Sequence, residues 1–528
     1  MSFNPFDLFI FFSFFLFIFA FIYFLFLKSK PPSFSIKHSN TTIAHGPPSY
    51  PIIGCLISFY KNRKRLLNWY TDLLSESSTQ TIVVSRLGER KVIVTANPKN
   101  VEYILKTNFS NFPKGQSFTE VLGDLLGNGI FNVDGELWAN QRKLASHEFT
   151  TKSLREFVVR ILEEEVDARL IPLLQLAAHE NRIIDLQEIL KRFTYDSICK
   201  VSLGIDPKCL DLSNPTPPIV TAFESAAEIS AKRSASPINV IWKLKRILNL
   251  GSEQQLKQSL NILHNHVSDI ICTKKESLAN SKESENHDLL SRFLFAGYDG
   301  NLARDMVISF IMAGRDTTAA AMTWLFWLLS SVDLGSRERI RDELTSGIDL
   351  SSGPLRYEIL KKELKYLHAC ICEAMRLYPP VAWDSKHAIN NDVLPDGTKV
   401  SKGDRVTYFP YGMGRMQAIW GKDYIKFKPD RWFESQTDDK SFSDNEKDRN
   451  NHARKLKMVN PYEFPVFQAG PRVCLGKEMA FIQMKYVIAS IISRFNFEPV
   501  NCEHPIFMPL LTSQMDGGLK VRVKEIIN

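Results

Sequence analysis

The stretch Phe467–Ala480, FQAGPRVCLGKEMA, decides how the rest of this chain is interpreted. A single cysteine, Cys474, stands two residues after Arg472 and two before Gly476, and a segment of helical character follows. A thiolate can ligate a metal, but the ordinary thiol pKa of about 8.5 means that the ionised form needs support. Gly470 and Gly476 let the backbone approach the sulfur, a helix start favours negative charge, and Arg472 adds a cation. The loop therefore predicts a thiolate held ready for ligation.

Taken alone, Cys474 would be assigned as a small buried structural residue. The loop as a whole, however, matches F-x-x-G-x-R-x-C-x-G at every fixed position, and on this pattern the chain resembles the cytochrome P-450 monooxygenases. The matching residues are Phe467, Gly470, Arg472, Cys474 and Gly476. The resemblance implies that Cys474 is the axial iron ligand of haem b, that Arg472 contacts a haem propionate, and that Phe467 shields the sulfur.

A second segment, residues 301–332, agrees with this resemblance. Its apolar and small residues follow the spacing of one helix face, and AGRDTT at 313–318 matches the family pattern A/G-G-x-D/E-T-T/S. The resemblance implies that small residues at 313 and 314 leave room for dioxygen, that Asp316 relays protons, and that Thr317 orients a water molecule. The alternative is a core helix in which Thr317 bonds back to a carbonyl one turn earlier.

Oppositely charged residues in an otherwise apolar segment predict a buried ion pair. Glu373 and Arg376 stand three residues apart in YLHACICEAMRLYPPV, where buried charges need partners. With Arg431 of KPDRW, they resemble the structural ionic triad of the family, which lies beneath the haem loop.

Two further positions resemble haem-propionate contacts of the family. Trp138 and Arg142 match the W-x-x-x-R pattern, and both side chains are expected to reach a propionate. Lys386 stands where many relatives carry a propionate-binding arginine. Lysine keeps the charge but lacks the planar fork of arginine.

The N-terminus has the composition of a membrane anchor. Residues 8–27 carry no charge, and a helix of that length spans the roughly 30 Å hydrocarbon core. The alternative, a cleaved signal peptide, has an apolar region of about 7–15 residues that ends in small residues. Asp7 before the span and lysines after it place the remainder in the cytosol. We expect an anchor at 1–30, a proline-rich linker at 31–54 and a catalytic domain at 55–528, on the endoplasmic reticulum membrane.

Composition indicates an ordinary globular body. The chain has 528 residues, 44% of them hydrophobic, and its net charge of +8 is not gathered into a basic stripe, which argues against nucleic-acid binding. Eight cysteines are too few for a disulfide framework. Residues 81–85 and 91–95 predict a hairpin, residues 98–377 are mostly helical in pattern, and 434–457 predict an exposed loop. The fold class is mainly α with a minor β portion; the resemblance implies a triangular helical prism around the haem.

Several segments, among them GRDTTAAAMTWLFWLLS and FPVFQAGPRVCLGKEMAF, resemble the plant fatty-acid ω-hydroxylase clan, above all the branch that includes jasmonoyl-amino-acid oxidases. The resemblance implies a monooxygenase that uses O2 and electrons from NADPH–cytochrome P-450 reductase to hydroxylate the terminal carbon of an aliphatic chain. A fatty acid or jasmonoyl-isoleucine is the expected substrate, with further oxidation left open. Terminal hydroxylation of a sterol side chain, in plant steroid or steroidal-alkaloid biosynthesis, remains the alternative. The expected channel walls are Phe112–Asp134 and Val381–Lys386.

Two other classes fit the sequence less well. A membrane-tethered haem sensor or carrier needs the cysteine loop but not the Asp316–Thr317 pair, and a purely structural membrane protein needs neither. Haem-thiolate isomerases generally lack that pair as well, so it favours a true monooxygenase.

Overall fold

The computed structural model describes residues 46–86, 90–213, 215–236, 239–280, 288–347, 357–434 and 454–526. The chain divides into two compact units, Met1–Ile43 and Ala44–Asn528, and all the described residues belong to the second. The predicted membrane helix at 8–27 and most of the predicted loop at 434–457 lie outside the described residues. Within the described part, no helix is both long enough and apolar enough to cross a bilayer.

Residues 46–54 pack on the folded body, although the sequence predicted that they end an extended linker. Gly54 forms a backbone bridge to Arg86, and the Cys55 amide donates to the Ser85 carbonyl at 2.8 Å. Gly54 has a φ of 57°, and a Cβ there would lie 2.3 Å from the Ser85 carbonyl oxygen, so only glycine fits. The compact unit starts before residue 55 because backbone pairing holds this segment against a strand end.

Helices make up most of the described unit, as the sequence predicted. The earlier ones are α2 (Leu56–Asn62), α3 (Leu66–Glu76), α4 (Pro98–Glu102), α5 (Gln116–Leu126), α6 (Gly135–Thr150), α7 (Lys152–Glu165), α8 (Ile171–His179), α9 (Leu186–Leu203), α10 (Pro218–Ala235), α11 (Asn239–Leu248) and α12 (Ser252–Asn280). The later ones are α13 (Leu289–Phe295), α14 (Gly300–Trp327), α15 (Leu334–Gly347), α16 (Tyr357–Lys362), α17 (Lys365–Leu377), α18 (Pro410–Met413), α19 (Gln417–Trp420) and α20 (Lys477–Ile492).

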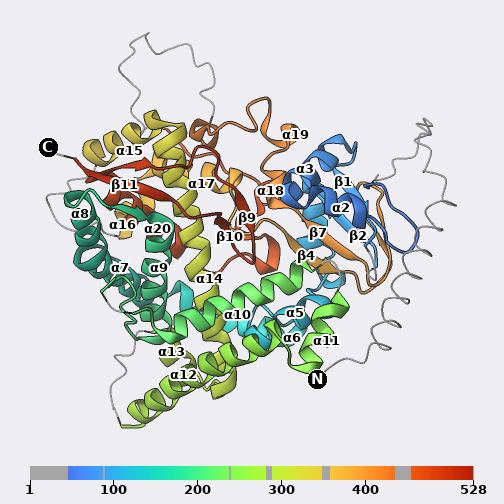
Figure 1. Ribbon diagram of the computed structural model, residues 1–528, viewed down its shortest axis with the longest axis horizontal. Coiled ribbons are helices and arrows are strands. Elements are labelled where there is room, and N and C mark those ends of the chain that lie inside the picture. Colours follow the sequence, from blue (N-terminus) through green and yellow to red (C-terminus); the bar gives the residue numbers. More distant parts are fainter. Residues whose placement is uncertain are drawn as a thin grey trace, which may run out of the picture. The chain divides into compact units, whose positions relative to one another are not determined.

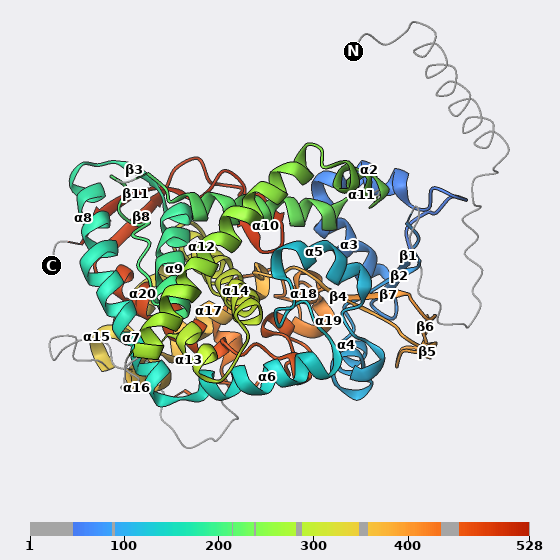
Figure 2. The same cartoon turned by 90° about the horizontal axis from the view of Figure 1, so that it is seen from below.

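Helix α14 is the central element of the unit. It has 28 residues, which at about 1.5 Å per residue makes it about 42 Å long. It packs against α9, α17 and α20, and it passes through the middle of the unit in both Figure 1 and Figure 2. A wider π-helical turn, Leu328–Val332, continues it.

Two sheets lie on opposite sides of α14 (Figures 1 and 2). The first has the order β1-β2-β7-β4, with β2 and β7 parallel and the other pairs antiparallel. Its β1–β2 pair confirms the predicted hairpin strands. The second has the order β3-β11-β8 and is antiparallel, and β5–β6 and β9–β10 form small pairs. The strands are β1 (Thr81–Val84), β2 (Val92–Thr95), β3 (Ile183–Asp185), β4 (Asp384–His387), β5 (Asp392–Val393), β6 (Lys399–Val400), β7 (Arg405–Tyr408), β8 (Phe495–Pro499), β9 (Phe507–Pro509), β10 (Ser513–Met515) and β11 (Lys520–Glu525).

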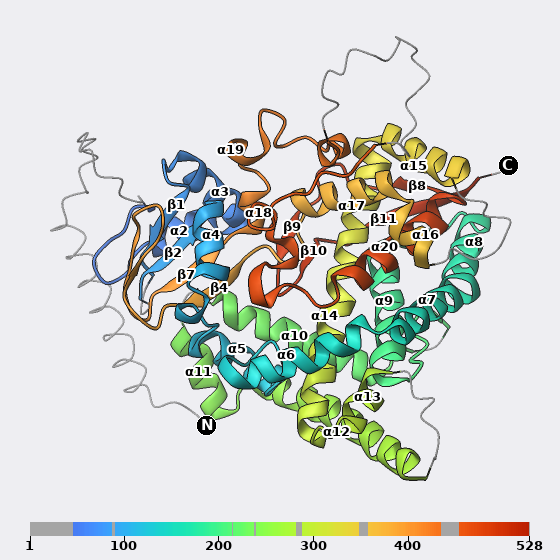
Figure 3. The same ribbon diagram turned by 180° about the vertical axis from the view of Figure 1, so that it is seen from behind.

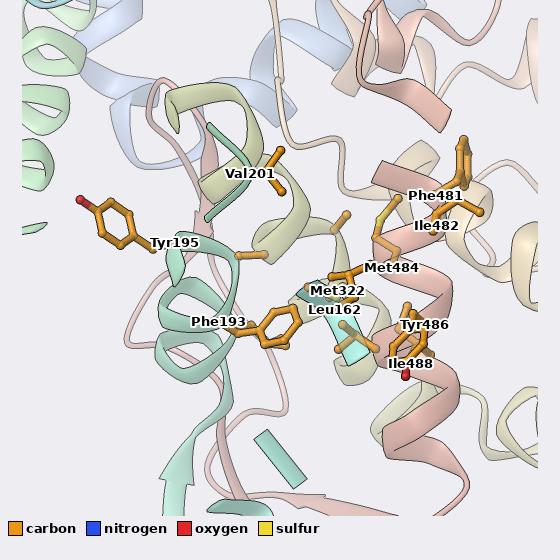
Figure 4. Packing of buried hydrophobic residues seen from close by; sticks show 14 of the residues in the cluster. Leu162, Phe193, Tyr195, Val201, Met322, Phe481, Ile482, Met484, Tyr486 and Ile488 are labelled. Atoms are coloured by element: carbon orange, nitrogen blue, oxygen red, sulfur yellow. The ribbon is translucent and has the colours of Figure 1, made fainter. Parts of the chain in front are cut away.

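Two hydrophobic clusters form the core. The smaller lies between α3 and the first sheet, and the larger joins the helices around α14. Phe193 of α9, Met322 of α14 and Met484 of α20 all belong to the larger cluster (Figure 4). Burying apolar side chains of this size contributes about 1.5–3 kcal/mol each. This contact holds the helix that follows Cys474 against the helix that carries Asp316 and Thr317.

Candidate active site

The Cys474 loop consists of two short turns that lead into α20. The 3₁₀ turns Pro465–Phe467 and Gly470–Arg472 reverse the chain, and the Cys474 amide donates to the Phe467 carbonyl at 2.8 Å. Gly476 is the N-cap of α20. Cys474 therefore lies just before a helix N-terminus, as the sequence predicted, where unpaired amides and the helix dipole favour a thiolate.

The Cys474 thiol keeps accessible surface although protein groups surround it. Burial is the largest influence on its pKa and raises it. The Gly476 amide, which donates a hydrogen bond, and the charges of Arg142 and Lys477 act in the opposite direction. Most of the other cysteines are buried.

The two loop glycines have different structural roles. Gly470 has a φ of 65°, and a Cβ there would lie 2.1 Å from the Leu105 carbonyl oxygen, so only glycine fits. Gly476 has a φ of −84°, and the nearest atom to an added Cβ belongs to Phe149 at 3.9 Å. The backbone therefore requires glycine at Gly470 but not at Gly476, although the Gly476 amide donates to the Cys474 sulfur as expected.

Phe467 packs on the first turns of α20. Its ring centre lies 5.2 Å from that of Phe481 and 5.6 Å from the Lys477 ammonium. It stands on the same loop as the sulfur, and its proposed shielding role stays a prediction.

Trp138 of α6 packs on Arg472 of the loop, and Arg142 of α6 interacts with Arg472 electrostatically, whereas their expected contacts with a propionate stay a prediction. The Arg472 guanidinium lies 4.4 Å from the Trp138 ring centre, and it donates to the Asp134 carboxylate at 2.6 Å. Burial lowers the pKa of Arg142, and the nearby Cys474 side chain raises it. The four-residue spacing puts Trp138 and Arg142 on one face of α6, the face toward the loop.

Lys386 of β4 is fully buried and paired. Its Nζ lies 2.7 Å from Asp384 Oδ2, which also accepts from Gln468 Nε2 at 2.6 Å and from the Tyr408 hydroxyl at 3.0 Å. Burial acts to raise the pKa of Asp384, but the charges of Lys386 and Lys114 outweigh it and hold that pKa well below its usual range. Because Gln468 belongs to the Cys474 loop, this network ties the loop to β4.

Lys114 is a cation that sequence reasoning missed. It is buried, its Nζ lies 4.1 Å from the Phe118 ring centre, and no carboxylate in the described ranges is within ion-pair distance of it. Burial lowers its pKa to about 7, and it interacts with the charges of Asp384, Lys386 and Arg472. The local sequence FPKGQ is that of a surface turn, so only the folded structure reveals this residue.

The charges around the loop fit a haem. Four cations share this region with two carboxylates, so two positive charges remain unbalanced; the groups are Lys114, Arg142, Lys386, Arg472, Asp134 and Asp384. Buried charges need partners, and the two propionates of haem b carry the two missing negative charges. The Nε of Arg472 is also buried without a hydrogen-bond partner in the described part of the chain. An accessible thiol beside surplus cations is a suitable donor set for haem.

The middle of helix α14 is more accessible than the residues on both sides of it, and we call this stretch the α14 opening. The side chains on both sides of this stretch are buried, whereas residues 312–314, Asp316 and Thr317 are half-buried. The Thr317 hydroxyl donates to the Ala313 carbonyl at 2.5 Å, as in the alternative weighed from the sequence. That bond uses the hydroxyl proton and leaves the oxygen able to accept from a water molecule, so the two interpretations are compatible.

Gly314 has a packing role. A Cβ at Gly314 would lie 2.7 Å from Ile198 Cδ1 of α9. Glycine therefore allows α9 and α14 to approach closely. The expectation that small residues at 313 and 314 leave room for dioxygen stays a prediction.

The predicted ionic triad is present. Glu373 and Arg376 of α17 are fully buried and joined by two hydrogen bonds of 2.8 and 2.9 Å. Arg431 Nε donates to the same carboxylate at 2.9 Å, as does Trp432 Nε1 at 3.0 Å. Arg376 also donates to the Lys426 carbonyl at 3.0 Å. The triad thereby ties α17 to the chain that leads into the Cys474 loop.

Comparison with known proteins agrees with this geometry. The model of the cytochrome P450 family matches residues 44–521. The chain belongs to the cytochrome P450 family. It is 58% identical to cytochrome P450 94B1 of Arabidopsis thaliana, with 92% of each chain covered, and 56% identical to cytochrome P450 94B3 of the same plant, with 93% of this chain and 94% of the relative covered. Cytochrome P450 94A1 of Vicia sativa is 44% identical over 91% of this chain and 90% of its own.

Membership confirms the resemblance, the enzyme class and the cofactor inferred from the sequence. This P450 is a monooxygenase whose haem iron has a thiolate ligand, and its reaction requires dioxygen, a reductase and a small-molecule substrate. The roles of the individual residues remain predictions, for which the contacts above supply the geometry.

Proposed function

We propose that the protein hydroxylates the terminal carbon of an aliphatic chain on a lipid, with a fatty acid or jasmonoyl-isoleucine as substrate. Electrons come from NADPH through cytochrome P450 reductase. Similarity over nearly the whole chain to P450s of the 94 series supports this proposal. A terminal methyl has the strongest C–H bonds of the chain, so the position of attack must come from how the substrate is held.

The two proposed channel walls meet beside the cations of the haem site. Phe112–Asp134 carries α5, which packs against α10 and α14, and Val381–Lys386 leads into β4. Lys114 of the first wall interacts electrostatically with Lys386 of the second. An aliphatic chain held between these walls would lie beside the cations proposed to bind the haem.

The observation that carries the lipid assignment is an exposed apolar face on α11. Val240, Ile241, Leu244, Ile247 and Leu248 are exposed at positions of one helix face, with Ile247 79% exposed. Lys243 and Arg246 of α11 form ion pairs with Glu120 and Asp124 of α5. These ion pairs hold α11 against α5, and an exposed apolar helix face of this kind is typical of contact with a membrane surface.

A lipid that leaves the membrane at α11 would next meet α5, which belongs to the proposed channel wall Phe112–Asp134. This contact also supports the proposed location, the endoplasmic reticulum membrane, with residues 1–30 as a single-pass anchor and the catalytic unit on the cytosolic side.

The chain's own groups have separate tasks in this mechanism. Bound haem supplies oxygen activation, with Cys474 as the proposed iron ligand. Lys114, Arg142 and Arg472 balance the propionates. Thr317 accepts from a water at the α14 opening, and Asp316 passes protons inward.

The test is turnover with reductase and NADPH on a panel of a long-chain fatty acid, jasmonoyl-isoleucine and a hydroxylated cholesterol, with products located by mass spectrometry. We expect a terminal alcohol from one of the first two. Product from the sterol alone would replace the proposal by the sterol alternative, which the relatives do not favour. Hydroxylation within the chain would contradict end-on binding.

A further inference from the structure

Helix α14 carries a buried arginine next to the acid proposed for proton delivery. Arg315 is 3% exposed, and its guanidinium lies 5.3 Å from the ring centre of Tyr195 on α9 and 5.8 Å from that of Phe223 on α10. Figure 4 shows Tyr195 pointing away from the core contact made by Phe193 of the same helix. The two rings restrict where the guanidinium can lie.

Two carboxylates flank this guanidinium. Its Nη2 forms an ion pair and a hydrogen bond with Glu224 of α10, whose side chain is 43% exposed. Its Nε lies 3.5 Å from Asp316 Oδ1, and the Asp316 side chain is 14% exposed. Arg315 therefore stands between a carboxylate that meets bulk water and one that faces the interior.

The contact with Asp316 is electrostatic and is not a hydrogen bond. Arg315 Nε is buried and has no acceptor within the described ranges, although Asp316 is within ion-pair distance. Burial acts to lower the pKa of Arg315, but the charges of Asp316 and Glu224 outweigh it and raise that pKa, so the group stays charged. A charged guanidinium with a free N–H would bind an adjacent carboxylate directly unless another partner restrained it. Glu224 is that partner.

We propose that Arg315 and Glu224 are positioning residues that keep the Asp316 carboxylate available for proton delivery. Glu224 fixes the guanidinium so that it attracts Asp316 without hydrogen bonding to it. This inference rests on the proposed function, since it takes Asp316 as the proton relay. Because Glu224 belongs to α10 and Arg315 to α14, the pair also makes proton delivery depend on the position of α10.

If Asp316 is not held in place, the products of the reaction follow from its balance of electrons and protons. Hydroxylation of one C–H bond by O2 uses two electrons and two protons, and it yields one alcohol and one water. NADPH supplies the electrons and solvent supplies the protons. If Arg315 bonded Asp316 directly, protons would arrive late, and the two electrons and two protons would leave with O2 as hydrogen peroxide. NADPH consumption would continue while the product yield fell.

The experiment measures alcohol and hydrogen peroxide formed per NADPH, with the solvent isotope effect on each, in the full-length haem-loaded enzyme with reductase. We expect Arg315→Gln and Glu224→Gln to lower the alcohol-to-peroxide ratio by about tenfold, as for a misplaced catalytic group. The carbon-monoxide band and the substrate-induced spectral shift should not change. Thr317→Ala is the reference for lost proton delivery. If Arg315→Gln does not fold, the alcohol-to-peroxide ratios of Arg315→Lys and Glu224→Gln test the inference instead.

Glu228→Gln is the matched control. Glu228 stands one turn later on α10, is exposed and pairs with Lys232. Its variant should therefore give the same alcohol-to-peroxide ratio as the wild type. In the Arg315→Gln background, Glu224→Gln should add no further loss, because Glu224 acts through Arg315. A wild-type alcohol-to-peroxide ratio in both single variants would overturn the inference. Additive decreases of that ratio in the double variant would overturn it as well.

A failure of the proposed function looks different. In that case the wild type itself makes no alcohol from any lipid of the panel. The inference is still decided then by the rate of peroxide formation and its isotope effect, which should differ between the Glu224 variant and the Glu228 control.

Discussion

Replacing Glu373 with glutamine tests whether the buried ion network beneath the Cys474 loop holds the fold. The Glu373 carboxylate accepts five hydrogen bonds. Three reach Oε1, from Arg376 Nη2, Arg431 Nε and the Lys428 amide, and two reach Oε2, from Arg376 Nε and Trp432 Nε1. Glutamine has nearly the same shape, so the substitution changes charge and hydrogen bonding while leaving the volume almost unchanged.

The cost follows from the donors that glutamine cannot satisfy. With its amide nitrogen at the Oε2 position, Arg376 Nε and Trp432 Nε1 face another donor, and two buried cations lose their counter-charge. An unsatisfied buried group costs about 1–3 kcal/mol, and breaking a buried ion pair from one side costs about 3–5 kcal/mol. The two figures describe the same loss, so we expect about 3–5 kcal/mol. Because total stabilities are about 5–15 kcal/mol, the variant should be marginal.

Urea unfolding of the haem-loaded protein measures this loss, with haem retention as a second readout. Glu358→Gln is the control, since Glu358 forms an exposed ion pair with Lys362 at 3.0 Å and should change stability by about 1 kcal/mol or less. A Glu373→Gln variant that unfolds at the same urea concentration as this control would refute the reasoning.

Three other substitutions test the site. Cys474→Ser should abolish the carbon-monoxide band typical of thiolate ligation, and an unchanged band would exclude Cys474 as the ligand. Gly470→Ala should lower the free energy of unfolding by at least about 1–2 kcal/mol and release haem, because the left-handed backbone there excludes a Cβ. The control Gly123→Ala, in an ordinary helical position with 3.6 Å of clearance, should do neither. Equal losses of stability in the two variants would contradict this reasoning. Haem binding should weaken as pH rises above about 7, because a propionate raises the pKa of Lys114 and binding then takes up a proton. Lys114→Met should flatten this dependence in titrations of haem retention, and an unchanged slope would exclude Lys114.

Short segments of sequence were enough to predict a feature wherever its functional groups lie close together along the chain. The Cys474 loop, the α14 pattern and the Glu373–Arg376 spacing each place their key groups within a few residues, and helix and loop geometry then determines how those groups face. The hairpin strands β1 and β2 follow from alternation and β-branched residues in the same way. These parts could be predicted because the relevant distances are set by neighbouring backbone.

Other features depend on segments that meet only in the folded chain. Lys114 looks like a surface lysine until the fold buries it beside Asp384, and the packing of Gly314 against Ile198 is visible only once α9 and α14 are placed together. The Glu224–Arg315 pair joins residues 91 positions apart. Sequence by itself determined the family and the helical fold, and it gave the prediction that Cys474 is the iron ligand, because all three depend on contiguous patterns. Tertiary structure alone decided which charges are balanced and which space is filled, because both depend on long-range packing and on the exclusion of water.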